Sequence, residues 1–190
     1  MKREWVAASV LLAIVGESAS GGECAGIAFP DQVQAQGESL TLNGLGAAKT
    51  NLLRVSVYVA ALYLTEPSSD PDQILQPNTP SELVLQFMRP VSANQLRRGW
   101  EEGFAKNTPG HPPGLEEGLR RLNTWVTNVT TGQRLAFIRI PGTGMQVEFG
   151  GTVIGTIQGN EFSRALLSIW LGGIPQSPEL KSGLLGEPCR

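Results

Sequence analysis

The only two tyrosines of the chain, Tyr58 and Tyr63, both lie in the segment "RVSVYVAALYL" at residues 54–64. This segment alternates like a β-strand, with Tyr58 on one face and Val57 and Val59 on the other. A phenol on a strand can donate a hydrogen bond to a ligand, or it can simply fill a half-buried sheet face. The alternation by itself leaves both roles open for the two tyrosines.

Other side chains that could perform acid–base or metal chemistry lack the partners that such chemistry needs. His111 is the sole histidine, and no nucleophile with an orienting carboxylate is recognisable near it. Paired glutamates lie beside arginines on helical segments, where salt-bridged and solvated faces are expected: Glu101, Glu102, Glu116 and Glu117. There is no Cys-x-x-Cys pair, so we expect neither a metal nor a cofactor.

Two further groups of residues have a structural and a functional interpretation. The "NGLG" at 43–46 lacks the third glycine of a phosphate-binding loop and precedes a strand, which favours a tight turn with close backbone approach. Arginines flank or occupy the expected strands, where each could hold a carboxylate but most would cover the exposed sheet face: Arg54, Arg89, Arg134 and Arg139. The tryptophans at 100, 125 and 170 are expected in the core.

The N-terminus has the pattern of a secretory signal peptide. Lys2 and Arg3 precede a short apolar run that is too short to span a bilayer, and small residues follow it. We therefore expect a signal peptide within residues 1–28, cleaved somewhere in 20–28, and a single domain at 29–190. Export from a bacterial cytoplasm would place this domain in the periplasm, with no membrane span after cleavage.

The oxidising conditions of that compartment would permit a disulfide between the two cysteines, Cys24 and Cys189. Whether the disulfide forms depends on the cleavage site, since cleavage near residue 28 would remove Cys24. The formal net charge is −2, and no basic block or stripe is present. This composition excludes nucleic acid as an expected partner.

The periodicity of the remaining chain predicts an α+β fold with an antiparallel sheet. Strands are expected around 39–42, at 53–64 and 81–89, and as a meander from 134 to 158 on Gly-rich turns. Helices are expected at 92–107, 115–129, 160–172 and 177–186. Because the helices are grouped and do not alternate with the strands, they should pack on one sheet face, which would leave the other face available for a cleft.

Taken in order, four stretches resemble the chalcone isomerase-like family, in its bacterial, secreted branch. They are "LNGLG…VYVAALYL", "LVLQFMRPVSANQLRRGWEEGF", "LAFIRIPGTGMQVEFGGTVIGTIQGNEFSRALLSIWLG" and "SPELKSGLLG". The resemblance covers the chain from about Phe29 onward. It implies an open-faced β-sandwich, in which a large antiparallel sheet has helices on one face and a ligand cleft between sheet and helices.

The residues that the plant isomerases of this family use are not present at the matching positions. The arginine that holds the phenolate falls on Ala48, beside Lys49, and the helix tyrosine falls on Leu96. The strand threonine falls on Tyr58. Ala48 cannot stabilise an oxyanion and Leu96 cannot shuttle a proton. The resemblance therefore implies a ligand site at Tyr58 with Lys49 and Arg54 as nearby cations, and Tyr63 in a structural role.

These observations favour a periplasmic, non-catalytic protein that binds an apolar or amphipathic small molecule, such as a fatty acid, as a sister branch of the family does. One alternative is an intramolecular lyase or isomerase with a rearranged active site. A second alternative is a structural or partner-binding protein of the cell envelope.

Overall fold

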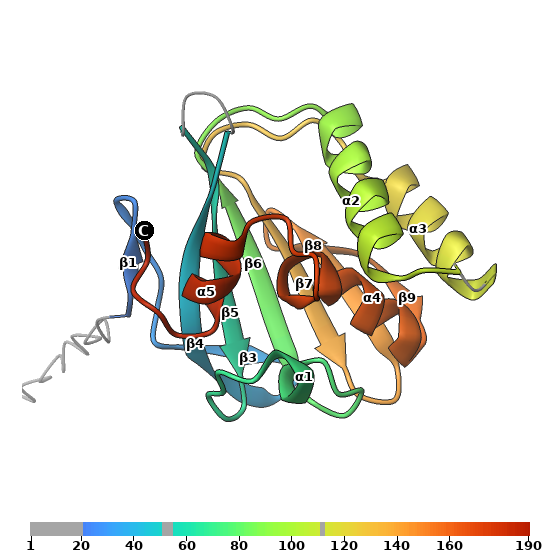
Figure 1. Cartoon of the computed structure of the whole chain (residues 1–190), viewed down its shortest axis with the longest axis horizontal. Helices are drawn as coiled ribbons and strands as arrows, with labels where there is room; N and C mark the ends of the chain where they lie inside the picture. The colour runs from blue at the N-terminus through green and yellow to red at the C-terminus, as the bar shows by residue number, and fades with distance from the viewer. Residues whose placement is uncertain (1–20, 51–54, 111–112) are drawn as a thin grey trace, which may run out of the picture.

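The alternating segment that holds both tyrosines forms the central part of a seven-stranded antiparallel sheet. The computed structural model describes residues 21–50, 55–110 and 113–190. Strand β5 (Ser56–Leu64) pairs with β4 (Glu38–Lys49) on one side and with β6 (Ser81–Phe87) on the other. The sheet order is β3-β4-β5-β6-β7-β8-β9, which adds β3 (Gln32–Ala35), β7 (Arg134–Ile140), β8 (Gly144–Phe149) and β9 (Thr152–Gln158). Strands that are neighbours in the sheet are thus consecutive in the chain, and β7, β8 and β9 form the meander predicted for 134–158 (Figure 1).

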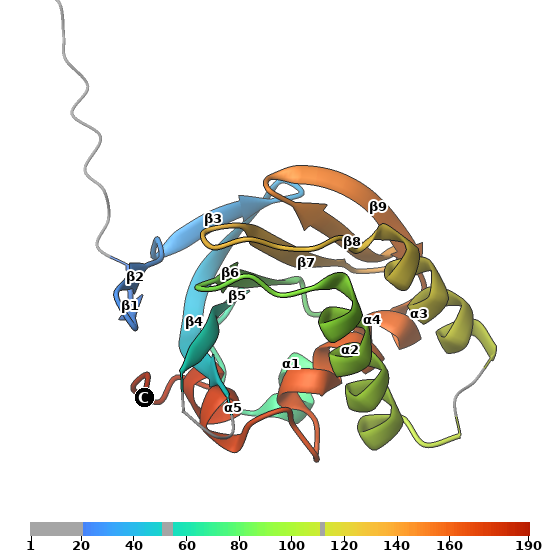
Figure 2. The same ribbon diagram turned by 90° about the horizontal axis from the view of Figure 1, so that it is seen from above.

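The sheet curves around the helices, and α1, α2, α4 and α5 lie on its concave side (Figure 2). Their bounds are Pro71–Ile74 for α1, Ala93–Asn107 for α2, Pro113–Trp125 for α3, Asn160–Leu171 for α4 and Pro178–Leu184 for α5. Between them and the sheet lies the larger hydrophobic cluster, whose members include Leu62, Phe137 and Trp170. The predicted class, α+β with helices on one face of an antiparallel sheet, is confirmed.

Helix α2 begins where the sequence predicts. The Ser92 side chain accepts a hydrogen bond from the Gln95 backbone N–H, and the Gln95 side chain accepts one from the Ser92 backbone N–H, which completes a capping box. Leu96, Trp100 and Phe104 are buried as expected from their four-residue spacing. The next helix is shorter than predicted, because α3 ends at Trp125 and the following segment turns back to the bridge between Val91 and Val129.

The expectation of a tight turn at "NGLG" is wrong, although close backbone approach is found there. Residues 43–46 lie inside β4, which has a register shift between Leu42 and Gly44. A Cβ on Gly44 would meet the backbone of α5 at 2.2 Å, and a Cβ on Gly46 would meet Leu180 at 2.6 Å. The glycines therefore allow α5 to pack directly on the strand. The short strand expected at 39–42 continues through them to Lys49.

Part of the other face of the sheet is covered by a second layer of side chains. Cys24 and Phe29 of the N-terminal segment, Ala35 of β3 and Leu40 of β4 pack with Val59, Ala61 and Tyr63 of β5 in a second hydrophobic cluster. The Tyr63 hydroxyl donates to the Pro30 carbonyl at 3.1 Å, which fits the structural role expected for this residue. A small cavity of about 170 Å³ remains beside Tyr63 and Glu82. Burial and the neighbouring Glu148 carboxylate raise the pKa of Glu82 to about 7.

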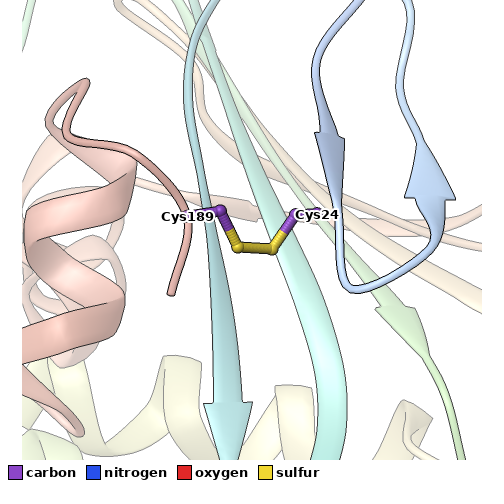
Figure 3. Close-up of a disulfide and its surroundings, with 2 residues drawn as sticks. All are labelled: Cys24 and Cys189. Carbon is purple, nitrogen blue, oxygen red and sulfur yellow. A yellow bond between two sulfur atoms is a disulfide. The ribbon is translucent and has the colours of Figure 1, made fainter.

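A disulfide joins Cys24 to Cys189 and so connects the two ends of the described chain (Figure 3). The two Cα atoms lie 5.7 Å apart, within the range for disulfides, and the bond closes a loop of 165 residues. Cys24 belongs to β1 (Glu23–Cys24), which pairs with β2 (Ile27–Ala28) in a small separate sheet. Within the described residues, no helix has the length and apolar character needed to cross a membrane.

Replacing both cysteines, as Cys24→Ser with Cys189→Ser, should lower the free energy of unfolding by about 3–5 kcal/mol, because the long closed loop no longer restricts the unfolded chain. Urea denaturation of the oxidised wild type and of the double variant measures this difference. Reductant should destabilise the wild type to the same extent and leave the double variant unchanged. Equal stability of the oxidised wild type and the variant would show that the disulfide does not stabilise this fold.

Candidate ligand-binding cleft

Two adjoining cavities lie between the sheet and helices α2 and α4. The first has a volume of about 350 Å³ and is lined mainly by apolar side chains, among them Leu85, Phe87, Leu96, Trp100 and Trp170; we call it the aromatic half. The second has a volume of about 310 Å³ and is lined by Lys49, Glu102, Lys106 and Ser177; we call it the basic half. Both are lined by Val57, Tyr58, Gly99, Ile169 and Gln176, so they form two halves of one cleft.

Tyr58 lies where the two halves meet. It is near the start of β5, and its side chain is on the helix side of the sheet. Its hydroxyl accepts a hydrogen bond from Trp170 Nε1 at 2.9 Å and donates one to Gln176 Oε1. Its ring packs edge-on against Phe87, with the ring centroids 5.7 Å apart. Tyr58 is 6% exposed, so its hydroxyl is held by these partners and does not point into open solvent. This chain of hydrogen bonds fixes a polar centre where the aromatic half meets the basic half.

The segment that follows α4 places Gln176 at the cleft. The Gln176 backbone N–H donates to the carbonyl of Ile169 at 2.9 Å. The Asn107 side chain, at the end of α2, pairs with both the N–H and the carbonyl of Ile174 at 2.9 Å. The segment is therefore tied to both helices that border the cleft, and Gln176 is positioned before any ligand arrives.

Burial of Tyr58 raises the pKa of its phenol far above the ordinary value, and the hydrogen bond from Trp170 only partly opposes this shift. The phenol is consequently protonated at neutral pH. A protonated phenol donates a hydrogen bond but does not act as a base. Tyr58 is therefore not suited to abstract a proton, and its single O–H is donated to Gln176.

The charges at the cleft are mainly positive. Lys49 and Lys106 border the basic half together with Glu102, and Arg89 borders the aromatic half. In the part of the chain that the structure describes, none of these three cations forms an ion pair. They can therefore attract an anionic group of a ligand in a protein whose net charge is slightly negative.

The structure brings together most of the residues that the sequence indicated. Tyr58 lines both halves and Lys49 lines the basic half, whereas Arg54 and His111 lie outside the described residues. Ala48 lines the basic half and Leu96 the aromatic half, so the positions matched to the family's functional residues do surround one cleft. The cleft lies between sheet and helices, as the family resemblance implied, and not on the sheet face that the grouping of the helices would leave available.

Three residues were not foreseen. Trp170 is buried as predicted, but it also donates its indole N–H to Tyr58. Gln176 lies in the loop after α4, where no periodic pattern in the sequence could indicate which residue contacts the cleft. Arg139 was expected to cover an exposed sheet face, and this is wrong, because it is 2% exposed on the helix side of the sheet. The described residues contain no group of His, Cys, Asp or Glu side chains that could hold a metal ion.

The titration of the two tyrosines should reveal their burial. Burial raises the pKa of Tyr63 to about 12 and that of Tyr58 further, so at about pH 11 the native protein should show little phenolate absorbance, whereas the unfolded chain should show both phenolates. Because the native state keeps protons that the unfolded chain loses, stability should fall as the pH rises above about 10. Spectrophotometric titration of phenolate absorbance to alkaline pH, with and without denaturant, measures both effects. In native Tyr58→Phe, a single ionisation should remain, near the pKa of Tyr63. Full ionisation of native protein at about pH 10 would contradict the described burial.

Comparisons with known proteins agree with this fold. The solved structures that resemble this chain include a fatty-acid binding protein from Arabidopsis thaliana, with a TM-score of 0.67 at 15% sequence identity, covering 84% of this chain and 92% of that chain. This likeness shows the fold. A search of curated proteins finds no significant match. The family model described as chalcone isomerase-like matches residues 21–186, which include all the strands and helices that the structure describes and both halves of the cleft. The chain therefore belongs to the chalcone isomerase-like family.

Proposed function

We propose that this protein is a non-catalytic binding protein for an amphipathic small molecule with an anionic head group, such as a fatty acid. The observation that carries the proposal is the pairing of an aromatic half with a basic half across the protonated Tyr58. The apolar chain of the ligand would lie among Phe87, Trp100 and Trp170, and the anionic group would lie near Lys49. The structural neighbour from Arabidopsis thaliana is itself a fatty-acid binding protein, which supports the same class of ligand.

The cleft favours binding over isomerisation. An isomerase of this family would need a cation to stabilise an oxyanion and a group to transfer a proton. The side chains at those matched positions are a methyl group at Ala48 and an isobutyl group at Leu96. At the third matched position, the hydroxyl of Tyr58 is already engaged with Trp170 and Gln176. These groups suit the retention of a ligand and supply no acid–base pair.

We further propose that the protein acts outside the cytoplasm, in the periplasm, after cleavage close to Ser20. The Cys24–Cys189 disulfide is the kind of bond that persists in an oxidising compartment. The Phe29 backbone N–H donates to the Gly22 carbonyl, so the residues from Gly22 to Phe29 are part of the folded domain. Cleavage near residue 28 would remove this contact and the disulfide together, which favours the earlier site.

Gly99 offers a direct test of the cleft as the ligand site. It lines both halves, and a Cβ built on it meets no atom within 4 Å. Gly99→Leu should therefore fill the cleft without a clash, and it should not destabilise α2 because leucine is the better helix former. Titration with a fluorescent long-chain fatty acid should show at least a tenfold loss of affinity. Gly114→Leu, at an exposed position of α3 with equally open space, is the matched control and should bind as the wild type does.

Two further variants test how much Tyr58, in the cleft wall, and Lys49, near the ligand's anionic head group, contribute to ligand affinity. Tyr58→Phe removes one hydroxyl and should weaken binding about twofold to tenfold, whereas Lys49→Gln should weaken it about twofold to fivefold, with the loss reduced at high salt.

Unchanged affinity in Gly99→Leu would overturn the proposed site. Turnover of a chalcone by the wild type that is lost in Tyr58→Phe would favour the isomerase alternative instead.

A further inference from the structure

Arg139 is the one charged side chain among the buried residues that the structure describes. It lies on β7 in the same alternation as Leu135 and Phe137, so it projects to the helix side of the sheet. The residue opposite it on β6 is Ser81, which is 1% exposed. Neither residue lines the cleft, so this pair is separate from the proposed ligand site.

The guanidinium of Arg139 is only partly satisfied. Its Nη2 donates to the backbone carbonyl of Ile74 in α1. Among the described residues, its Nε and Nη1 have no partner, and neither has the hydroxyl of Ser81. Burial lowers the pKa of Arg139 to about 10, and no carboxylate of the described residues forms an ion pair that would offset the cost of burying its charge. Two unpartnered donors and an unpartnered hydroxyl on facing strand positions thus share one buried location.

A buried cation without a counter-charge is costly, and the cost falls when an anion accepts its hydrogen bonds. The planar fork of a guanidinium matches the two oxygens of a carboxylate. The surrounding side chains are tightly buried, since Ile74, Phe137 and Met145 are at most 1% exposed. An anion that reaches these donors must therefore be small. A single negative charge would neutralise the single positive charge of Arg139.

We propose that Arg139 and Ser81 form an interior binding site for a small carboxylate anion of the size of formate or acetate. Arg139 supplies the charge and the two free donors, and the Ser81 hydroxyl supplies a third hydrogen bond. The one-turn helix α1 covers the site, because its Ile74 carbonyl holds the guanidinium. Local opening of this short helix gives the anion its route into the site.

The test is the thermal unfolding midpoint of the disulfide-bonded protein, measured as sodium formate or acetate replaces sodium gluconate at constant ionic strength. Gluconate is a carboxylate too large to be enclosed, so it controls for salt. The wild-type midpoint should rise by about 3–5 °C when the small anion reaches ten times its dissociation constant. Arg139→Met should show no such rise, and in gluconate it should melt no lower than the wild type because it removes an unpaired buried charge.

Two other variants keep the test decisive if Arg139→Met does not fold. Ser81→Ala retains the guanidinium and should weaken the apparent affinity for formate about threefold to tenfold. Arg134→Met removes an exposed arginine from the opposite face of β7 and should respond to formate as the wild type does. The proposal is overturned if formate and gluconate give the wild type the same midpoint, or if the formate response is unchanged in Ser81→Ala.

Discussion

Strand β5 is buried on both of its faces, and the rest of the molecule is arranged around this constraint. Val59, Ala60, Ala61 and Leu62 are each 0% exposed, so two separate hydrophobic layers must cover them. The helices provide one layer and the N-terminal segment with β3 provides the other. The disulfide fastens the N-terminal segment to the chain end and so keeps the second layer in place. Tyr58 lies at the end of this strand, where the helix layer gives way to the cleft.

The cleft depends on how closely the helices can approach one another and the sheet. Gly103 of α2 lies directly against Ile169 of α4, where a Cβ would come within 2.7 Å of the isoleucine side chain. The glycines of β4 allow the same close contact with α5. One helix turn before Gly103, Gly99 lies beside open space that lines both halves of the cleft. Small residues thus fix the helix positions, and the absence of a side chain at Gly99 leaves room for a ligand.

The fold was largely predictable from the sequence, because its strongest signals are periodic. The alternation at 54–64 and the four-residue spacing of Leu96, Trp100 and Phe104 each reflect burial of one face, which local patterns record well. The strand through "NGLG" was missed. Its glycines are needed for close packing against α5, a segment far away in the chain. Local propensity favours a turn there, and tertiary contact overrides it.

The site was predictable only in part, because several of its contacts join segments that are far apart in the chain. Tyr58 was indicated by alternation and by its matched position in the family, but its partners Trp170 and Gln176 come from the other end of the chain. Arg139 was misjudged, because a strand arginine usually covers an exposed face and nothing local marks the residue that α1 and Ser81 enclose. Side chains that act through distant partners leave no periodic signal in the sequence.

The most direct test of the central claim, that the cleft holds an amphipathic ligand, is native mass spectrometry of the protein purified from its native source, followed by extraction and identification of any bound molecule. The account predicts a co-purified amphiphile with an anionic head group, which is absent from Gly99→Leu and retained by Gly114→Leu. An empty wild-type protein that also fails to take up added long-chain fatty acid would contradict it.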